Sequence, residues 1–272
     1  MTIPVVVGVD GSEASLEAVD WAADEAVRHG VPLLILHAAP GSHEASDLLT
    51  AASERARRGV PTVRLSSEVS REDAPSALIG RGRNAFALVL GSRGLGDLAD
   101  MLLGSVSLAV AARADCPVVV VRGDAAHREA RFGNIVVGIE DEQNSGTALE
   151  FAFREVQARR CRLVAVHAWV APSGTFSTPQ APSWPLEAHL RPPAQVLDDA
   201  LRGPAAQYLD TLVERRLIEA PARQAVLEAA SEADLLVIGA RPRRVRQGLQ
   251  LGLINHALLH HAPCPTAVVP HR

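Results

Sequence analysis

The sequence predicts an α/β protein of two tandem domains, each a mostly parallel sheet of five strands with helices on both faces. Short apolar runs alternate with helical patterns along the chain, as expected for βα units. Residues 5–39, shifted by 130 positions, are identical at 10 of 35 positions, and residues 85–121, shifted by 148, at 13 of 37. Hydrophobic residues make up 47% of the chain and aromatic residues only 3%, so aliphatic side chains must fill the core, as in buried parallel strands.

The first unit can be followed element by element. The apolar run at 5–9 predicts a buried strand, and Ser12 is placed to cap the next helix, which ends at Gly30. The following elements are a strand at 33–38, a helix with polar faces at 44–58, an alternating edge-type strand at 61–69 and a helix at 73–83. The unit closes with a strand at 87–90, a glycine-rich loop, a helix at 104–113 and a strand at 117–121. Asp10 and Gly91 both follow strand ends, so we expect them to line one crevice.

The second unit repeats this order. A polar stretch at 122–131 predicts a linker between domains at 1–124 and 132–272. The second domain carries an insert near 170–204, which makes the segment between Ala168 and Gly239 longer by 18 residues. Its seven prolines exclude a long helix from its first part. With Trp169, Phe176 and Trp184, the insert is either a flap over a site or a surface loop pinned by its tryptophans.

The glycine-rich loop is the main functional signal. Gly91 and Gly94 follow a buried strand, and Gly104 and Ser105 open a helix after nine intervening residues. Such a loop can hold a phosphate on backbone N–H groups, or it can be a tight turn without a ligand. A Walker loop is excluded because the chain contains no lysine, and the G-x-G-x-x-G dinucleotide motif is absent from the first βα turn. A phosphate would therefore be held by backbone N–H groups, Ser105, Ser107 and Arg93.

The spacing G-x-x-G, nine residues, G-S/T resembles the ATP-binding motif of the universal stress protein family, and residues 5–12 resemble that family's first strand and its aspartate. The resemblance, to members with two tandem domains, implies Rossmann-like domains of the adenine nucleotide alpha hydrolase type, with the first domain binding ATP, with or without Mg²⁺. It places Asp10 against the adenosine and Ala38 near the adenine. The residues that it implies for the site are Gly8, Val9, Asp10, Ala38, Gly91, Ser92, Arg93, Gly94, Leu95, Gly96, Asp97, Gly104, Ser105, Val106 and Ser107.

The second domain has a degenerate version of this motif. Pro242 replaces Gly94 and removes a backbone N–H, Leu253 replaces Ser105, and Glu140 replaces Asp10. Four arginines at 241–246 either clamp an anion or partner, or form a solvated loop. We therefore expect about one tightly bound ATP per chain.

No catalytic set of residues is evident, and we expect no enzyme, or at most weak ATP hydrolysis. The segment at Asp10 lacks the double glycine of the SGGxDS loop of ATP pyrophosphatases. Asp10 itself either contacts a ribose or begins a turn before Ser12. The set His256, His260, His261 and Cys264 does not match the spacing of a zinc site, and we interpret it as a solvated helix face.

The expected role is a nucleotide-dependent regulator or sensor of stress, with two alternatives: an interaction module with decayed sites, and an ATP-using enzyme of the adenylyl-transfer type. The net charge of −4 argues against general binding to nucleic acids or membrane surfaces. No apolar run approaches the ~18 residues of a membrane helix, and no signal peptide precedes the first strand, so we expect a cytoplasmic protein. The strands at 117–121 and 266–269 end the two units, and in the family such last strands pair domains, so we expect the two halves to pack pseudo-symmetrically through them and the chain to form a homodimer. We also expect a protein partner that the sequence does not identify.

Overall fold

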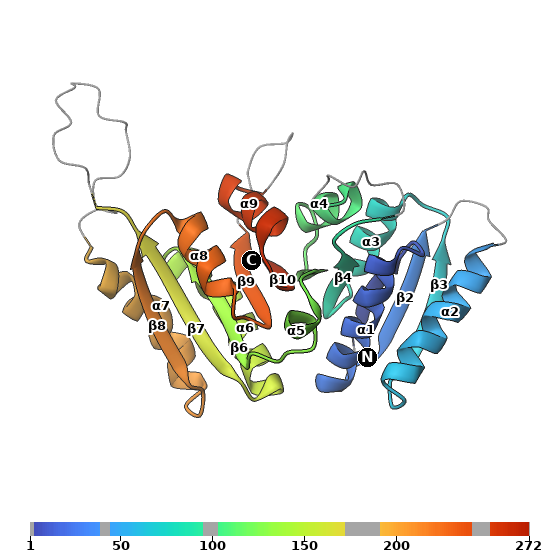
Figure 1. Cartoon of the computed structure of the whole chain (residues 1–272), viewed down its shortest axis with the longest axis horizontal. Helices are drawn as coiled ribbons and strands as arrows, with labels where there is room; N and C mark the ends of the chain where they lie inside the picture. The colour runs from blue at the N-terminus through green and yellow to red at the C-terminus, as the bar shows by residue number, and fades with distance from the viewer. Residues whose placement is uncertain (1–2, 39–43, 95–102, 172–190, 241–250, 272) are drawn as a thin grey trace, which may run out of the picture.

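A computed structural model describes residues 3–38, 44–94, 103–171, 191–240 and 251–271. The first half contains β1 (Val5–Val9), α1 (Glu13–Arg28), β2 (Leu33–Ala38), α2 (Glu44–Gly59), β3 (Leu65–Ser70), α3 (Ala74–Gly82), β4 (Ala87–Gly91), α4 (Ser105–Ala111) and β5 (Val118–Val121) (Figure 1). After a short helix, α5 (Ala125–Arg128), the second half contains β6 (Asn134–Ile139), α6 (Glu142–Arg159), β7 (Arg162–Trp169), α7 (Pro193–Gln207), β8 (Val213–Glu219), α8 (Ala222–Ala230), β9 (Leu235–Ala240), α9 (Leu253–His261) and β10 (Thr266–Pro270).

Local signals set most of these boundaries. Ser12 caps α1 as predicted, with its hydroxyl accepting a hydrogen bond from the backbone N–H of Ser15. Helix α1 ends at Arg28, and Gly30 adopts the left-handed conformation, with φ of 65°, that glycine tolerates after a helix. Strand β3 begins at Leu65 rather than at residue 61, because the turn that follows α2 extends through Pro61 and Thr62.

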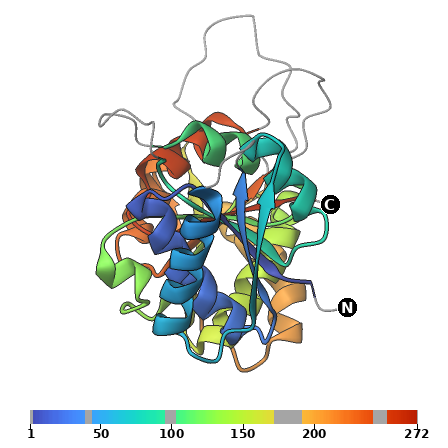
Figure 2. The ribbon, with the colours of Figure 1, turned by 90° about the vertical axis from the view of Figure 1, so that its right-hand side faces the viewer.

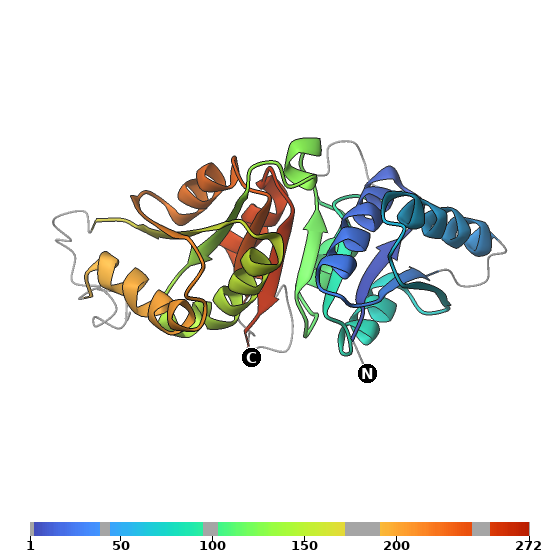
Figure 3. The same cartoon turned by 90° about the horizontal axis from the view of Figure 1, so that it is seen from below.

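The ten strands of the described residues form one sheet in the order β3-β2-β1-β4-β5-β10-β9-β6-β7-β8. Each half is the predicted parallel five-stranded unit, and the halves join where β5 and β10 pair antiparallel, with Val119 opposite Ala267. Seen from below, β5 and β10 lie side by side between the two halves (Figure 3). The two expected sheets are therefore continuous with each other.

This pairing confirms the expected packing of the two halves through their last strands, and it corrects the expectation that the same strands form a homodimer interface. Strand β5 pairs with β4 on one side and β10 on the other, and β10 pairs with β9 and β5. Neither strand has a free edge for a second chain. The strands at the outer edges of the sheet are β3 and β8.

Two apolar cores cover the two faces of the sheet, and each core runs through both halves. One core joins α1, α2, α6 and α7 to one face, and the other joins α3, α4, α8 and α9 to the opposite face. Seen from the end of the first half, the strands run between helices (Figure 2). Consecutive valines alternate between the cores: Val119 and Val121 belong to the first, and Val118 and Val120 to the second.

The predicted linker contains structure that its sequence pattern does not suggest. Asp124 caps α5 by accepting from the backbone N–H of His127. Arg128 forms an ion pair of 2.8 Å with Glu17 of the first half, and His127 Nε2 lies 3.1 Å from the carbonyl oxygen of Ser231 in the second. The linker is thus attached to both halves.

In the insert, residues 172–190, with Phe176 and Trp184, lie outside the described residues. The two alternatives for the insert, a flap over a site and a surface loop, therefore both remain predictions. Helix α7 begins after them and tolerates Pro204 in its last turn. Among the described residues, no helix is both long and apolar enough to span a membrane.

Candidate functional site

A cavity of about 330 Å³ lies at the carboxyl ends of β1, β2 and β4, beside the first turns of α3 and α4. This is the position at which parallel α/β sheets bind ligands. Its walls are formed by Gly8, Val9, Asp10, Ser15, Leu36, Ala38, Ala74, Leu78, Leu90, Gly91, Arg93, Gly94, Gly104, Ser105, Val106 and Ser107.

The structure brings together predicted residues from four separate segments, at the ends of β1 and β2, after β4 and at the start of α4. Those that line the cavity are Gly8, Val9, Asp10, Ala38, Gly91, Arg93, Gly94, Gly104, Ser105, Val106 and Ser107. Ser92 is not part of the lining, but its carbonyl oxygen accepts a hydrogen bond of 2.7 Å from the backbone N–H of Gly104 and so closes the base of the loop. Leu95, Gly96 and Asp97 lie outside the described residues.

Five lining residues were missed by sequence reasoning: Ser15, Leu36, Ala74, Leu78 and Leu90. A signal for Leu36 was available, because a strand residue two positions before Ala38 faces the same side of the sheet. Ala74 and Leu78 come from the first turns of α3, which no motif connects to the loop. Leu36, Ala74, Leu78 and Leu90 are the apolar part of the lining, whereas Asp10, Arg93 and Ser105 are polar.

Asp10 begins the turn before Ser12, as one of the two alternatives predicted, and it also lies at the cavity. It lines the cavity, and its Oδ1 accepts hydrogen bonds from the backbone N–H of Ser12 at 3.0 Å and from the Ser12 hydroxyl at 2.6 Å. Gly11 between them has φ of 90°, which glycine adopts without strain. The turn at the end of β1 therefore fixes the carboxylate beside the cavity.

Gly91 is required by packing within the protein. A Cβ atom at this position would lie 2.6 Å from the backbone carbonyl group of Ala14, in the first turn of α1. The end of β4 therefore approaches α1 more closely than any side chain permits. The neighbour that excludes a side chain at Gly91 is therefore the backbone of α1.

The loop returns to the cavity at the start of α4. Gly104 stands at the N-cap position without a capping side chain, and Ser105, Val106 and Ser107 form the first turn. The hydroxyl of Ser107 is buried and donates a 2.7 Å hydrogen bond to the carbonyl oxygen of Gly91. Backbone and side-chain contacts thus tie both ends of the loop together.

Comparison with known proteins agrees with this geometry. The model of the "Universal stress protein family" matches residues 1–54, 41–122 and 131–270. The chain belongs to the universal stress protein family. A universal stress protein of Mycolicibacterium smegmatis (strain ATCC 700084 / mc(2)155) is 31% identical over 288 residues, covering 97% of this chain and 96% of that protein. A universal stress protein of Mycobacterium tuberculosis (strain ATCC 25618 / H37Rv) is 31% identical over 287 residues, with the same coverage.

The fold of the whole chain is also that of a universal stress protein. The crystal structure of such a protein from Archaeoglobus fulgidus DSM 4304 has a TM-score of 0.69 and 17% sequence identity, and the alignment covers 99% of this chain and 98% of that one. The likeness therefore includes both tandem units and the way in which they join.

In this universal stress protein the second half keeps the framework of the cavity and changes its lining. Asn255 takes the place of Ser107, and its amide donates a 2.7 Å hydrogen bond to the carbonyl oxygen of Gly239. Leu253, in place of Ser105, is 90% exposed at the start of α9. The replacement Pro242 and the arginines at 241–246 lie outside the described residues.

A histidine repeats at the end of the second strand of each half. Nδ1 of His37 lies 2.7 Å from the carbonyl oxygen of Val9, and Nδ1 of His167 lies 3.0 Å from that of Ile139. Since a carbonyl oxygen only accepts, Nδ1 carries the proton in both rings. These histidines hold the ends of adjacent strands together.

The histidines of α9 do not gather into a metal site. His256 and His260 lie with ring centroids 4.4 Å apart, and the ring of His261 is 6.4 Å from that of His260. Cys264 is fully buried, and burial raises the pKa of its thiol to about 12. Among the described residues, three or more potential metal ligands converge only at Glu25, His29 and Glu155, far along the chain from this helix.

Proposed function

We propose that this universal stress protein binds ATP in the cavity of its first half and acts as a nucleotide-dependent regulator or sensor in the response to stress. The observation that carries the proposal is the cavity itself. Three distant segments, the end of β1, the loop after β4 and the start of α4, supply the family's glycine motif and aspartate to one space of about 330 Å³.

The lining suits an adenine nucleotide. Leu36, Leu78 and Leu90 offer apolar surface for a base, and the carboxylate of Asp10 can accept hydrogen bonds from ribose hydroxyls. The backbone N–H groups at the start of α4 and the hydroxyl of Ser105 suit phosphate oxygens. Hydrogen bonds to a charged phosphate contribute about 1.5–3 kcal/mol each.

We propose a binding protein that turns over ATP weakly or not at all. The described part of the cavity offers one carboxylate, from Asp10, whose Oδ1 is engaged by Ser12, and no histidine. A general base for proton transfer therefore has no evident candidate in this lining.

Nucleotide release tests the proposal directly. Protein purified gently and then denatured should release a compound with adenine absorbance, in a ratio of about one per chain. Calorimetry with ATP, with Mg²⁺ and with EDTA, then measures affinity and the part played by the metal. No released nucleotide and no binding heat would favour an interaction module with decayed sites, and release of pyrophosphate would favour adenylyl transfer.

The matched substitutions Gly104→Val and Gly252→Val test whether the ATP site lies in the first half. Gly104 and Gly252 occupy the N-cap positions of α4 and α9. A valine at 104 should weaken ATP binding more than tenfold with an unchanged circular dichroism spectrum, and a valine at 252 should leave the affinity as it was. Equal effects of the two substitutions would contradict the assignment to the first half.

A further inference from the structure

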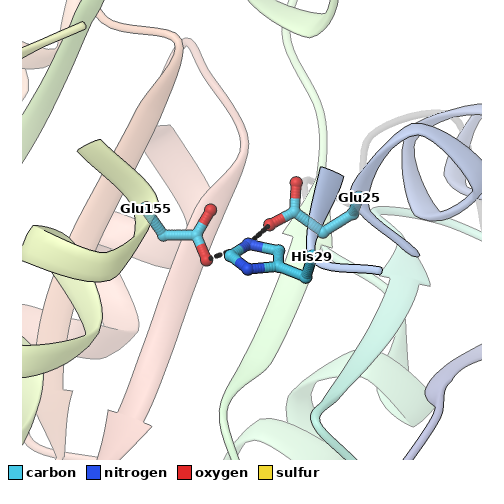
Figure 4. Close-up of side chains that lie close together, drawn as sticks. All are labelled: Glu25, His29 and Glu155. Atoms are coloured by element: carbon cyan, nitrogen blue, oxygen red, sulfur yellow. Dashed lines mark hydrogen bonds and ion pairs between the residues drawn. The ribbon is translucent and has the colours of Figure 1, made fainter. Parts of the chain in front are cut away.

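Four charged side chains meet where α1 of the first half lies against α6 of the second. Glu25 and His29 come from α1, and Glu155 and Arg159 come from α6. The 130-residue shift that aligns the repeats places Glu25 on Glu155 and His29 on Arg159. Figure 4 shows the imidazole of His29 between the carboxylates of Glu25 and Glu155. We call these four residues the joint cluster.

Each carboxylate of the joint cluster is shared between the two cations. Nε2 of His29 lies 3.1 Å from Oε1 of Glu25 and 3.0 Å from Oε1 of Glu155. The guanidinium of Arg159 lies 2.6 Å from Oε2 of Glu25 and 3.2 Å from Oε2 of Glu155. The side chains of Glu25 and Glu155 are 2% and 0% exposed, and that of His29 is 11% exposed. The contacts of His29 with Glu155 and of Arg159 with Glu25 therefore join the two halves of the chain, and the side chains that make them are almost fully buried.

Other charges face this cluster from the same two helices. On α1, Arg28 pairs with Glu25 at 2.5 Å, and Asp24 is within electrostatic range of Arg28 and Arg159. On α6, Arg154 lies over the ring of Phe86, which in turn packs against the ring of His29 with centroids 4.6 Å apart. Cys161 follows α6, and burial raises the pKa of its thiol to about 11.

With His29 protonated and the three acids ionised, charges balance among the groups closest to the cluster, and this ionisation is opposed at Glu155, whose pKa is raised by burial and by the charge of Glu25. The acids are Asp24, Glu25 and Glu155, and the cations are Arg28, Arg159 and His29. Burial lowers the pKa of His29, but its contacts with Glu155 and Glu25 outweigh burial and raise the pKa to about 9. His29 is also the C-cap residue of α1, where the helix dipole favours a cation.

A divalent metal fits this place less well than a proton does. The ligand atoms of Glu25, His29 and Glu155 lie within 4.8 Å of one another. However, Arg159 already binds both carboxylates, and Arg28 binds one of them. A dication at Nε2 would stand among two guanidinium groups in a buried setting, where unbalanced charge is costly.

We propose that protonated His29 latches the two halves of the sheet together, and that loss of this proton at alkaline pH loosens the contact between α1 and α6. The latch does not depend on nucleotide binding. It acts between the two halves, on the face of the sheet that carries the core of α1, α2, α6 and α7.

The pH dependence has a defined sign. The pKa of His29 is raised from 6.5 to about 9 on folding, so its stabilising effect is complete below pH 6.5 and is lost as the pH rises through 9. Between these values the folded chain holds one proton more than the unfolded chain. The unfolding constant of the intact chain should therefore gain about tenfold per pH unit from this residue.

The test compares urea unfolding of the full chain and of His29→Gln from pH 6 to 10. The contribution of about tenfold per pH unit should disappear in H29Q and persist in the control His261→Gln, whose side chain is exposed on α9. Direct NMR titration of the His29 ring in the unmodified chain supplies a second measurement if H29Q does not fold. A ring that titrates near 6.5, or an H29Q variant with the slope of the unmodified chain, would overturn the proposal.

Hydrogen exchange distinguishes a local loosening of the contact between α1 and α6 from a change in global stability. After correction for intrinsic exchange rates, amides in the last turns of α1 and α6 should lose protection between pH 7 and pH 9.5, and those of α8 should not. Uniform loss along the chain would contradict a local latch. Stabilisation by stoichiometric Zn²⁺ in the unmodified chain, absent in H29Q, would show that the cluster holds a metal ion instead.

Discussion

The hydroxyl of Ser107 donates a 2.7 Å hydrogen bond to the carbonyl oxygen of Gly91, sixteen positions earlier in the chain. This bond links the first turn of α4 to the end of β4 and so fixes the width of the loop between them. In the second half, Asn255 makes the equivalent bond to Gly239. The bond is kept although the side chain has changed, which indicates that the framework of the site is maintained separately from its lining.

Removing this hydroxyl should weaken both the fold and the proposed site. Ser107→Ala leaves the carbonyl of Gly91 without its partner, and we expect a loss of about 1–3 kcal/mol in urea unfolding together with weaker ATP binding. Asn255→Ala should cost a similar stability and leave ATP affinity unchanged. Equal loss of affinity in both variants would show that the effect on binding is indirect.

A methyl group at Gly91 should be more damaging than one at the equivalent position of the second half. In Gly91→Ala the new Cβ would lie 2.6 Å from the backbone of Ala14, whereas in Gly239→Ala the nearest atom is the carbonyl oxygen of Asn144 at 3.1 Å. We expect a stability loss of about 3 kcal/mol for the first and clearly less for the second. Gly80→Ala, where a Cβ meets nothing within 4 Å, is the control for thermal unfolding.

The chain should bind about one ATP tightly. Leu253, 90% exposed in place of Ser105, offers no hydroxyl, and Pro242 in place of Gly94 has no backbone N–H. Equilibrium dialysis at saturating ATP counts the sites. Two sites of equal affinity would mean that the second half compensates for both substitutions.

Asp234 should be critical for holding the first residues of the second half in place. Its carboxylate accepts backbone N–H groups from Phe132 at 2.9 Å, Gly133 at 2.7 Å and Asn134 at 3.2 Å. Asp234→Ala leaves these donors without their acceptor, and we expect a loss on the order of 3 kcal/mol in urea unfolding. Asp234→Asn, which keeps one oxygen, should lose less. No measurable change in the alanine variant would show that water replaces the carboxylate.

Local patterns were sufficient to predict most of the fold. The apolar run at 5–9 and the cap at Ser12 were confirmed, because each depends on neighbours within a few positions. The strand ends also correctly indicated that Asp10 and Gly91 would line one cavity, since parallel strands end at the same edge of a sheet.

Long-range pairing was predicted only in part. The strands at 117–121 and 266–269 were expected to pack the two halves together, but an apolar run reads the same whether its partner is β10 or a second chain, so a homodimer interface was expected as well. The joint cluster was missed for a related reason. Glu25 and Glu155 align in the repeat, but only the packing of α1 on α6 makes them neighbours.

The antiparallel ladder between β5 and β10 joins two segments of one polypeptide. The two halves therefore meet at an effective concentration on the order of millimolar, whatever the abundance of the protein, because short linkers hold binding partners at such values. An interface between identical subunits imposes every substitution on both sides at once. Covalent fusion removes that constraint, so the half that carries Ser105 and the half that carries Leu253 can specialise for different tasks within one sheet.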